Sequence, residues 1–142
     1  MKALTVYEPW ASLIAAGLKR YETRGFKTNY RGLIAIHAAK RWEKDQDAAL
    51  RRLAAQHEEI RKYLSYEWPL GCVVAACRLV TVHPTEKLHK DLRDNHKLEY
   101  ALGDYSPERF AWELQVVKLP DKPIPAIGQQ GIWEWHYTGG GG

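Results

Sequence analysis

The sequence has no long apolar run, and it is poor in cysteine, methionine and phenylalanine, with two, one and two residues respectively. No segment approaches the roughly 18–20 apolar residues that a membrane helix needs. The N-terminal residues also lack the apolar stretch of a signal peptide. These absences exclude a membrane-spanning protein, and we expect a cytoplasmic protein without membrane contact.

Several motifs that would identify a reaction are missing. The chain has no glycine-rich phosphate loop, no Rossmann glycine pattern, no HExxH helix and no GxSxG elbow. His89 and His96 are seven residues apart but have no evident third partner, so we predict no metal site. Cys72 and Cys77 lie five apart in an apolar run, where a strand points them to opposite faces. We expect two core thiols, without a disulfide, and no organic cofactor.

The composition is that of a single folded domain. The 142 residues are 45% hydrophobic, enough for one core. We place the domain at residues 1–138, followed by a flexible glycine tail at 139–142. The net charge of +4 is a mild basic excess, compatible with polyanionic partners. Six tryptophans and eight tyrosines either fill the core or stack on nucleobases.

The patterns predict about six short strands and two or three helices. Strands are expected near residues 2–7, 19–24, 32–38, 70–82, 110–119 and 131–135. Pro9 suits the first turn of a helix that ends at Gly17. Leu50, Leu53, Ile60 and Leu64 fall on one face of an amphipathic helix over 43–65. Residues 84–95 are expected to form a loop with a short helix, and 99–109 a functional loop. The strands do not alternate regularly with helices, which favours an α+β fold built on a small barrel.

The densest polar chemistry lies between Gly17 and Arg24. On a regular strand Glu22 and Arg24 share a face, so Lys19 meets Glu22 only from a turn before the strand. Taken alone, this span is typical of a solvated ion-pair patch. His37, inside an apolar strand, is more typical of a structural histidine than of a site residue.

The combined motif order resembles the ASCH domain family, whose fold is similar to the PUA barrel. The resemblance covers nearly the whole chain, and it is carried by residues 7–14, 17–24, 30–32, 36–40, 102–112 and 128–133. It implies a barrel of about six strands whose first helix caps a cleft. Many members are proposed to bind RNA, and some small bacterial members resemble amidohydrolases that deacylate N4-acylcytidines.

In those amidohydrolases a lysine stands in a G-x-K motif, a threonine follows three residues later, and a distant glutamate completes the set. Here the lysine is Lys19, but the threonine position holds Glu22, and Thr23 is one residue out of phase. Glu99 is a candidate for the glutamate. We therefore assign Glu22 as general base toward water and Lys19 as the group that polarises the acyl oxygen or protonates N4. A neutral Lys19 acting as base or nucleophile is the reverse assignment.

The resemblance also suggests residues that bind the modified nucleoside. Tyr7 and Trp10 are candidates for stacking on the base, and Arg24 for orienting Glu22 or holding a ligand oxygen. The remaining candidates are two residues that could offer hydroxyl groups, Tyr105 and Ser106, together with His37 in the third predicted strand and Lys40 just after it.

Two other functions use the same cleft. An RNA-binding module would rely on a basic rim of Arg20, Lys27, Arg31, Lys40 and Arg41, and an RNA-cleaving enzyme would use Lys19 with a tyrosine. The favoured partner is a small modified nucleoside such as N4-acetylcytidine, with RNA as the alternative, and a monomer is expected.

Overall fold

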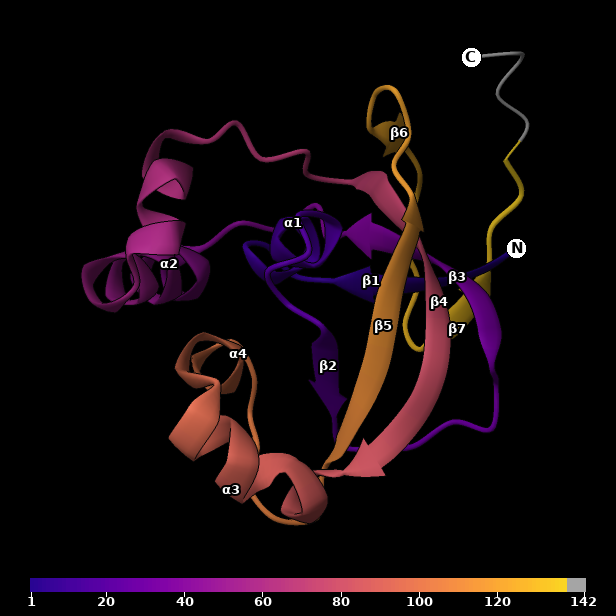
Figure 1. Ribbon diagram of the computed structural model, residues 1–142. Helices are drawn as coiled ribbons and strands as arrows, with labels where there is room; N and C mark the ends of the chain where they lie inside the picture. The colour runs from indigo at the N-terminus through magenta and orange to yellow at the C-terminus, as the bar shows by residue number, and fades with distance from the viewer. Residues whose placement is uncertain (138–142) are drawn as a thin grey trace.

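The computed structural model describes residues 1–137, so the glycine tail predicted at 139–142 lies outside the described residues. Within them, seven strands form one curled sheet, a half-barrel with helices on one side (Figure 1). This confirms the predicted α+β fold and small-barrel architecture. The strands are β1 (Lys2–Val6), β2 (Tyr21–Arg24), β3 (Gly32–Ala38), β4 (Cys72–Pro84), β5 (Phe110–Lys118), β6 (Ile124–Pro125) and β7 (Ile132–Glu134).

The sheet curls around its longest strand, β4. The strand order is β2-β5-β4-β3-β1-β7, and β6 pairs with the start of β4. Only the β1–β3 pair is parallel among the pairings of these strands. The register of β4 shifts against β5 after Ala76 and after Leu79, and such bulges bend a strand and increase its twist. The added strand, β6, is two residues long and ends in a proline, too short for an alternating pattern to predict it.

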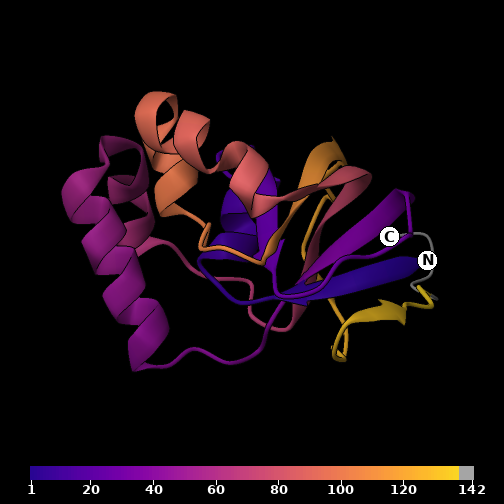
Figure 2. The same cartoon turned by 90° about the horizontal axis from the view of Figure 1, so that it is seen from below.

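Helix α1 (Trp10–Ala15) lies between the sheet and the other helices (Figures 1 and 2). Ala11 and Ile14 pack into the sheet core with Trp112, while Leu13 contacts the helical layer. Gly17 follows the helix with φ +79°, the left-handed conformation that ends helices at little cost for glycine. The first helix thus joins two cores.

The long helix expected over 43–65 is divided in two. Helix α2 spans Lys44–Gln56, His57 is extended, and a 3₁₀ helix, η1, spans Glu58–Ser65. The break turns the chain back so that Ile60 and Tyr63 pack in the same core as Leu50 and Leu53. One straight helix would carry Ile60 away from that core, so tertiary packing overrides the continuous helical pattern.

Two further helices fill the segment between β4 and β5: α3 (Thr85–Asn95) and α4 (Lys97–Ala101). More of this segment is helical than expected, because Leu88 and Leu92, one turn apart, pack against Tyr21 and Tyr105. Both cysteines are free thiols, but only Cys77 is buried in the core as predicted, whereas Cys72 is half-buried. Among the described helices none is long and apolar enough to span a membrane.

Candidate active site

Lys19 lies on a tight turn between α1 and β2. The N–H groups of Leu18 and Lys19 both donate to the Leu13 carbonyl, at 3.0 and 3.1 Å, which fixes the turn. Lys19 therefore precedes β2, the geometry that contact with Glu22 requires. Its side chain is 1% exposed, and Nζ donates to the Leu102 carbonyl oxygen at 2.6 Å.

The Glu22 carboxylate lies between two cations. Its Oε1 is 3.7 Å from Lys19 Nζ, and its Oε2 accepts a hydrogen bond of 2.9 Å from Arg24 Nε. Arg24 also donates through Nη2 to the Thr5 carbonyl oxygen at 2.8 Å. The Glu22 side chain is 11% exposed, so the interpretation of this span as a solvated ion-pair patch is wrong.

A second buried carboxylate, that of Glu99, accepts hydrogen bonds from the backbone just after Lys19. Glu99 Oε1 accepts the Arg20 N–H at 2.8 Å, and Oε2 accepts the Tyr21 N–H at 3.4 Å. Burial raises the pKa of Glu99, against these hydrogen bonds and the charge of Lys19. Burial also lowers the pKa of Lys19, opposed by Glu22 and Glu99. Glu99 thus positions the turn, and it lies outside the cavity lining.

Lys19 and Glu22 open into a cavity of about 470 Å³. This volume lies within the roughly 300–1,000 Å³ typical of small-molecule sites. Strands β1 and β2, the start of α1, helix α2 and the loop after α4 all contribute to it. The lining comprises Thr5, Val6, Tyr7, Trp10, Lys19, Glu22, Thr23, Arg24, Arg52, Ala101, Leu102, Gly103 and Asp104.

The structure brings five of the nine predicted site residues into this cavity: Lys19, Glu22, Tyr7, Trp10 and Arg24. Tyr105 and Ser106 lie outside its lining. The Tyr105 ring is buried with Leu92 and Ala111, and the Ser106 hydroxyl donates to Asp104 Oδ1 at 2.6 Å. Thr23 does line the cavity, where its Oγ1 accepts the Asp104 N–H at 3.0 Å.

The loop after α4 can lie close to β2 because residue 103 is a glycine. A Cβ on Gly103 would lie 2.9 Å from the Tyr105 ring and 3.1 Å from the Thr23 methyl group. This loop lies within residues 99–109, which the sequence predicts as a functional loop, whereas Thr5, Val6 and Arg52 line the cavity without having been predicted. Arg52 belongs to the charged face of α2, where the helical pattern alone indicates a solvated side chain.

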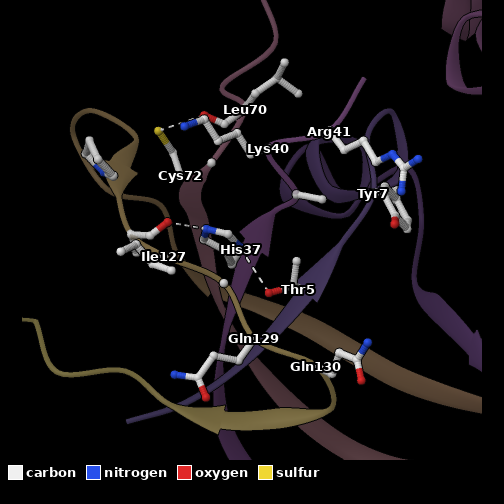
Figure 3. Close-up of a pocket in the computed structure, with 15 residues that line it drawn as sticks. Thr5, Tyr7, His37, Lys40, Arg41, Leu70, Cys72, Ile127, Gln129 and Gln130 are labelled. Atoms are coloured by element: carbon white, nitrogen blue, oxygen red, sulfur yellow. Dashed lines mark hydrogen bonds between the residues drawn. The ribbon is translucent and has the colours of Figure 1, made fainter. Parts of the chain in front are cut away.

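The other two predicted residues, His37 and Lys40, line a neighbouring cavity of about 910 Å³ (Figure 3). His37 is buried there. Its Nε2 donates to the Ala126 carbonyl oxygen at 2.7 Å, and its Nδ1 lies 3.1 Å from Thr5 Oγ1. Trp133 Nε1 donates to the same Thr5 oxygen at 3.1 Å. Both ring nitrogens of His37 are thus engaged within the protein, as expected of a structural histidine.

No group of three or more His, Cys, Asp or Glu side chains within residues 1–137 is arranged to hold a metal ion. The smaller cavity is lined by a buried amine, by two carboxylates, those of Glu22 and Asp104, and by two guanidinium groups, and it is bounded by aromatic rings. Such a set can move protons and stabilise a developing negative charge.

Comparison with known proteins identifies the family. The family model described as the ASCH domain matches residues 4–123. This chain belongs to the ASCH domain family. Two relatives of this ASCH domain are activating signal cointegrator 1 from Homo sapiens, 32% identical over 137 residues, and from Mus musculus, 26% identical over 137 residues. Each alignment covers 92% of this chain, which spans only 22% of either relative.

Among solved structures, the ASCH domain is similar to a tyrosine-to-phenylalanine variant of the ZmASCH protein from Zymomonas mobilis. The identity is 14% and the TM-score 0.48, and the match covers 87% of this chain and 74% of the other.

Proposed function

We propose that this ASCH domain is an amidohydrolase that removes the acyl group from N4-acylated cytosine nucleosides such as N4-acetylcytidine. The observation that carries the proposal is the buried Lys19 ammonium 3.7 Å from the Glu22 carboxylate, at the wall of a cavity of about 470 Å³. A module that only bound RNA would gain nothing from a buried carboxylate, which repels the phosphate backbone.

In the proposed reaction Glu22 takes a proton from water, and the resulting hydroxide adds to the acyl carbon. The oxyanion that forms is stabilised by Lys19, whose amine is aimed by its hydrogen bond to the Leu102 carbonyl. The bond between the acyl carbon and N4 then breaks, and Lys19 gives its proton to N4. Cytidine and a carboxylic acid leave, and the proton held by Glu22 returns to Lys19.

Arg24 has a positioning role in this scheme. It holds Glu22 Oε2 and is itself held by the Thr5 carbonyl, so Oε1 stays directed toward Lys19. Tyr7, 45% exposed, and the half-buried Trp10 supply flat surfaces at the cavity wall. Stacking of one base on such a ring contributes about 1–3 kcal/mol.

The test is release of cytidine from N4-acetylcytidine, followed by chromatography. We expect Lys19→Met and Glu22→Gln each to lower kcat/KM by roughly 100- to 10,000-fold, the range for one well-placed acid or base. Lys118→Met, at an exposed lysine outside the cavity lining, is the matched control and keeps the wild-type rate. Wild-type turnover by a folded Lys19→Met variant would contradict the proposal.

RNA cleavage is the second candidate, favoured by Tyr7, which is exposed and lines the same cavity as Lys19. Incubation with a single-stranded RNA separates the two activities. Under this alternative, Tyr7→Phe abolishes fragment formation and N4-acetylcytidine stays intact.

A further inference from the structure

The larger cavity adjoins the proposed active site. Thr5 and Tyr7 line both hollows, so a ligand group that leaves the smaller cavity past these residues enters the larger one. Arg24 links the walls of the two hollows, with hydrogen bonds of 2.9 Å to the Glu22 carboxylate and 2.8 Å to the Thr5 carbonyl. The second cavity is therefore placed to receive another part of the molecule that reacts at Lys19 and Glu22.

The charges around the second cavity favour an anionic ligand. Lys40 and Arg41 line it, and its lining contains no carboxylate. Arg41, which lies beside Tyr7 in Figure 3, is paired with Glu43 at 2.8 Å. Lys40 forms no ion pair among residues 1–137, so its ammonium is the cation available to a ligand.

The rest of the lining offers apolar surface and amides. Leu70, Pro125, Ala126 and the 90%-exposed Ile127 provide apolar contacts. Gln129 and Gln130 extend from the loop before β7 (Figure 3), and a glutamine amide can pair with the edge of a nucleobase. A volume of about 910 Å³ is suited to a larger group than a lone phosphate.

We propose that this cavity is a subsite for the nucleotide next to the modified cytidine, with the linking phosphodiester beside Lys40 and the adjoining base among Gln129, Gln130 and Ile127. The substrate class is then N4-acylcytidine within a polynucleotide, and free nucleosides react more slowly. This inference rests on the proposed function for the reaction, but not for the binding of a nucleotide in the second cavity.

The kinetic test compares N4-acetylcytidine, its 5′- and 3′-monophosphates, and a trinucleotide with N4-acetylcytidine at the centre. We expect kcat/KM for the trinucleotide to exceed that for the nucleoside by about tenfold or more, from one phosphate contact and the amide and apolar contacts of one added base. If either monophosphate had a kcat/KM equal to that of the trinucleotide, the assignment of the cavity to a whole nucleotide would be overturned.

Two variants test whether the preference for the trinucleotide depends on Lys40. Lys40→Met should bring the ratio of the two kcat/KM values close to one. Lys118→Met removes the same charge from an exposed lysine outside both cavities, and we expect it to preserve the ratio. Equal loss in the two variants would overturn the subsite, because it would mean that diffuse basic charge attracts the polynucleotide.

A binding measurement separates this inference from the proposed function. Cys72 lines the second cavity, whereas Cys77 is fully buried. Alkylation of Cys72 at alkaline pH, read by mass spectrometry, should slow in the presence of an unmodified trinucleotide, and Lys40→Met should remove this protection. Protection without hydrolysis of any compound would end the amidohydrolase proposal and retain the nucleotide subsite. Hydrolysis without protection would end the subsite and retain the amidohydrolase.

Discussion

At the scale of single residues, the proposed reaction depends on the protonation of Lys19. Its amine is removed from water, and burial lowers its pKa more than the two nearby carboxylates raise it. A lysine in this environment gives up its proton more readily than a lysine in water. The same shift would also permit a neutral Lys19 to act as a base, so the direction of the pH dependence distinguishes the two assignments.

We expect kcat for N4-acetylcytidine to fall as pH rises, with a midpoint below 10.5, the ordinary pKa of lysine. The sign follows because an acid is active while it holds its proton, below its folded-state pKa, and is lost above it. The measurement is a pH–rate profile with the Lys19→Met variant as control, whose residual rate should lack this limb. A rate that rises through the same pH range would show that neutral Lys19 is the base or nucleophile.

From the residues alone, the Lys19–Glu22 contact was conditional on a turn before the strand, and it was the family resemblance that indicated Lys19 and Glu22 as site residues. The sequence was insufficient for Tyr105 and Arg52. A tyrosine in a loop fits either a buried or a solvated position, and the pattern of an exposed arginine on a helix does not show that a cavity lies beside it. Only the packing of α3 against β2 and of α2 beside the loop after α4 decides both cases.

At the scale of elements, the loop before β7 can lie close to β1 and β3 because residue 128 is a glycine. A Cβ there would lie 2.7 Å from His37 Cε1 and 2.7 Å from Thr5 Oγ1. Neither atom belongs to a flexible side-chain end, since His37 is hydrogen-bonded at both nitrogens and Thr5 is bonded to Trp133. The glycine is therefore required for close approach of the backbone.

We expect Gly128→Ala to lower the free energy of unfolding by roughly 1–3 kcal/mol, the usual range for an overpacked site. Gly25→Ala is the control, because its Cβ would meet only Arg109, at 3.8 Å, and its φ is not positive. Urea denaturation followed by tryptophan fluorescence measures both variants. Equal stability of the two would mean that the loop can move away from His37 freely.

The break between α2 and η1 shows what the local sequence pattern does not predict. Leu50, Leu53, Ile60 and Leu64 fit one helical face, yet the chain breaks at His57, whose φ is −133° and ψ 113°. No glycine or proline marks this point. The break is favoured by the burial of Ile60 and Tyr63 against residues far away in sequence, which periodicity cannot register.

At the scale of the whole molecule, α1 joins two apolar cores. One lies between α1 and the sheet, and the other lies beneath α2 and η1, with Leu13 of α1 at its centre. A helix that contributes to both cores couples them mechanically. The sheet and the helical layer should therefore unfold together.

Ile60→Ala tests this coupling, because Ile60 is fully buried in the helical layer. We expect a loss of about 2–5 kcal/mol in unfolding free energy, with one transition by both circular dichroism and tryptophan fluorescence. Leu64→Ala, in the same 3₁₀ helix but at a side chain that is 52% exposed, should change stability by about 0.5 kcal/mol or less. Two separate transitions in the Ile60 variant would show that the layers unfold independently.

The position of β1 has a consequence for synthesis on the ribosome. This first strand is interior to the sheet, with β3 on one side and β7 on the other. Translation proceeds at roughly 5–20 residues per second, so one edge of β1 stays uncovered for several seconds after β3 is made. During that interval the nascent chain exposes a strand edge to aggregation, and it is protected only when Trp133 arrives and closes over Thr5 and His37.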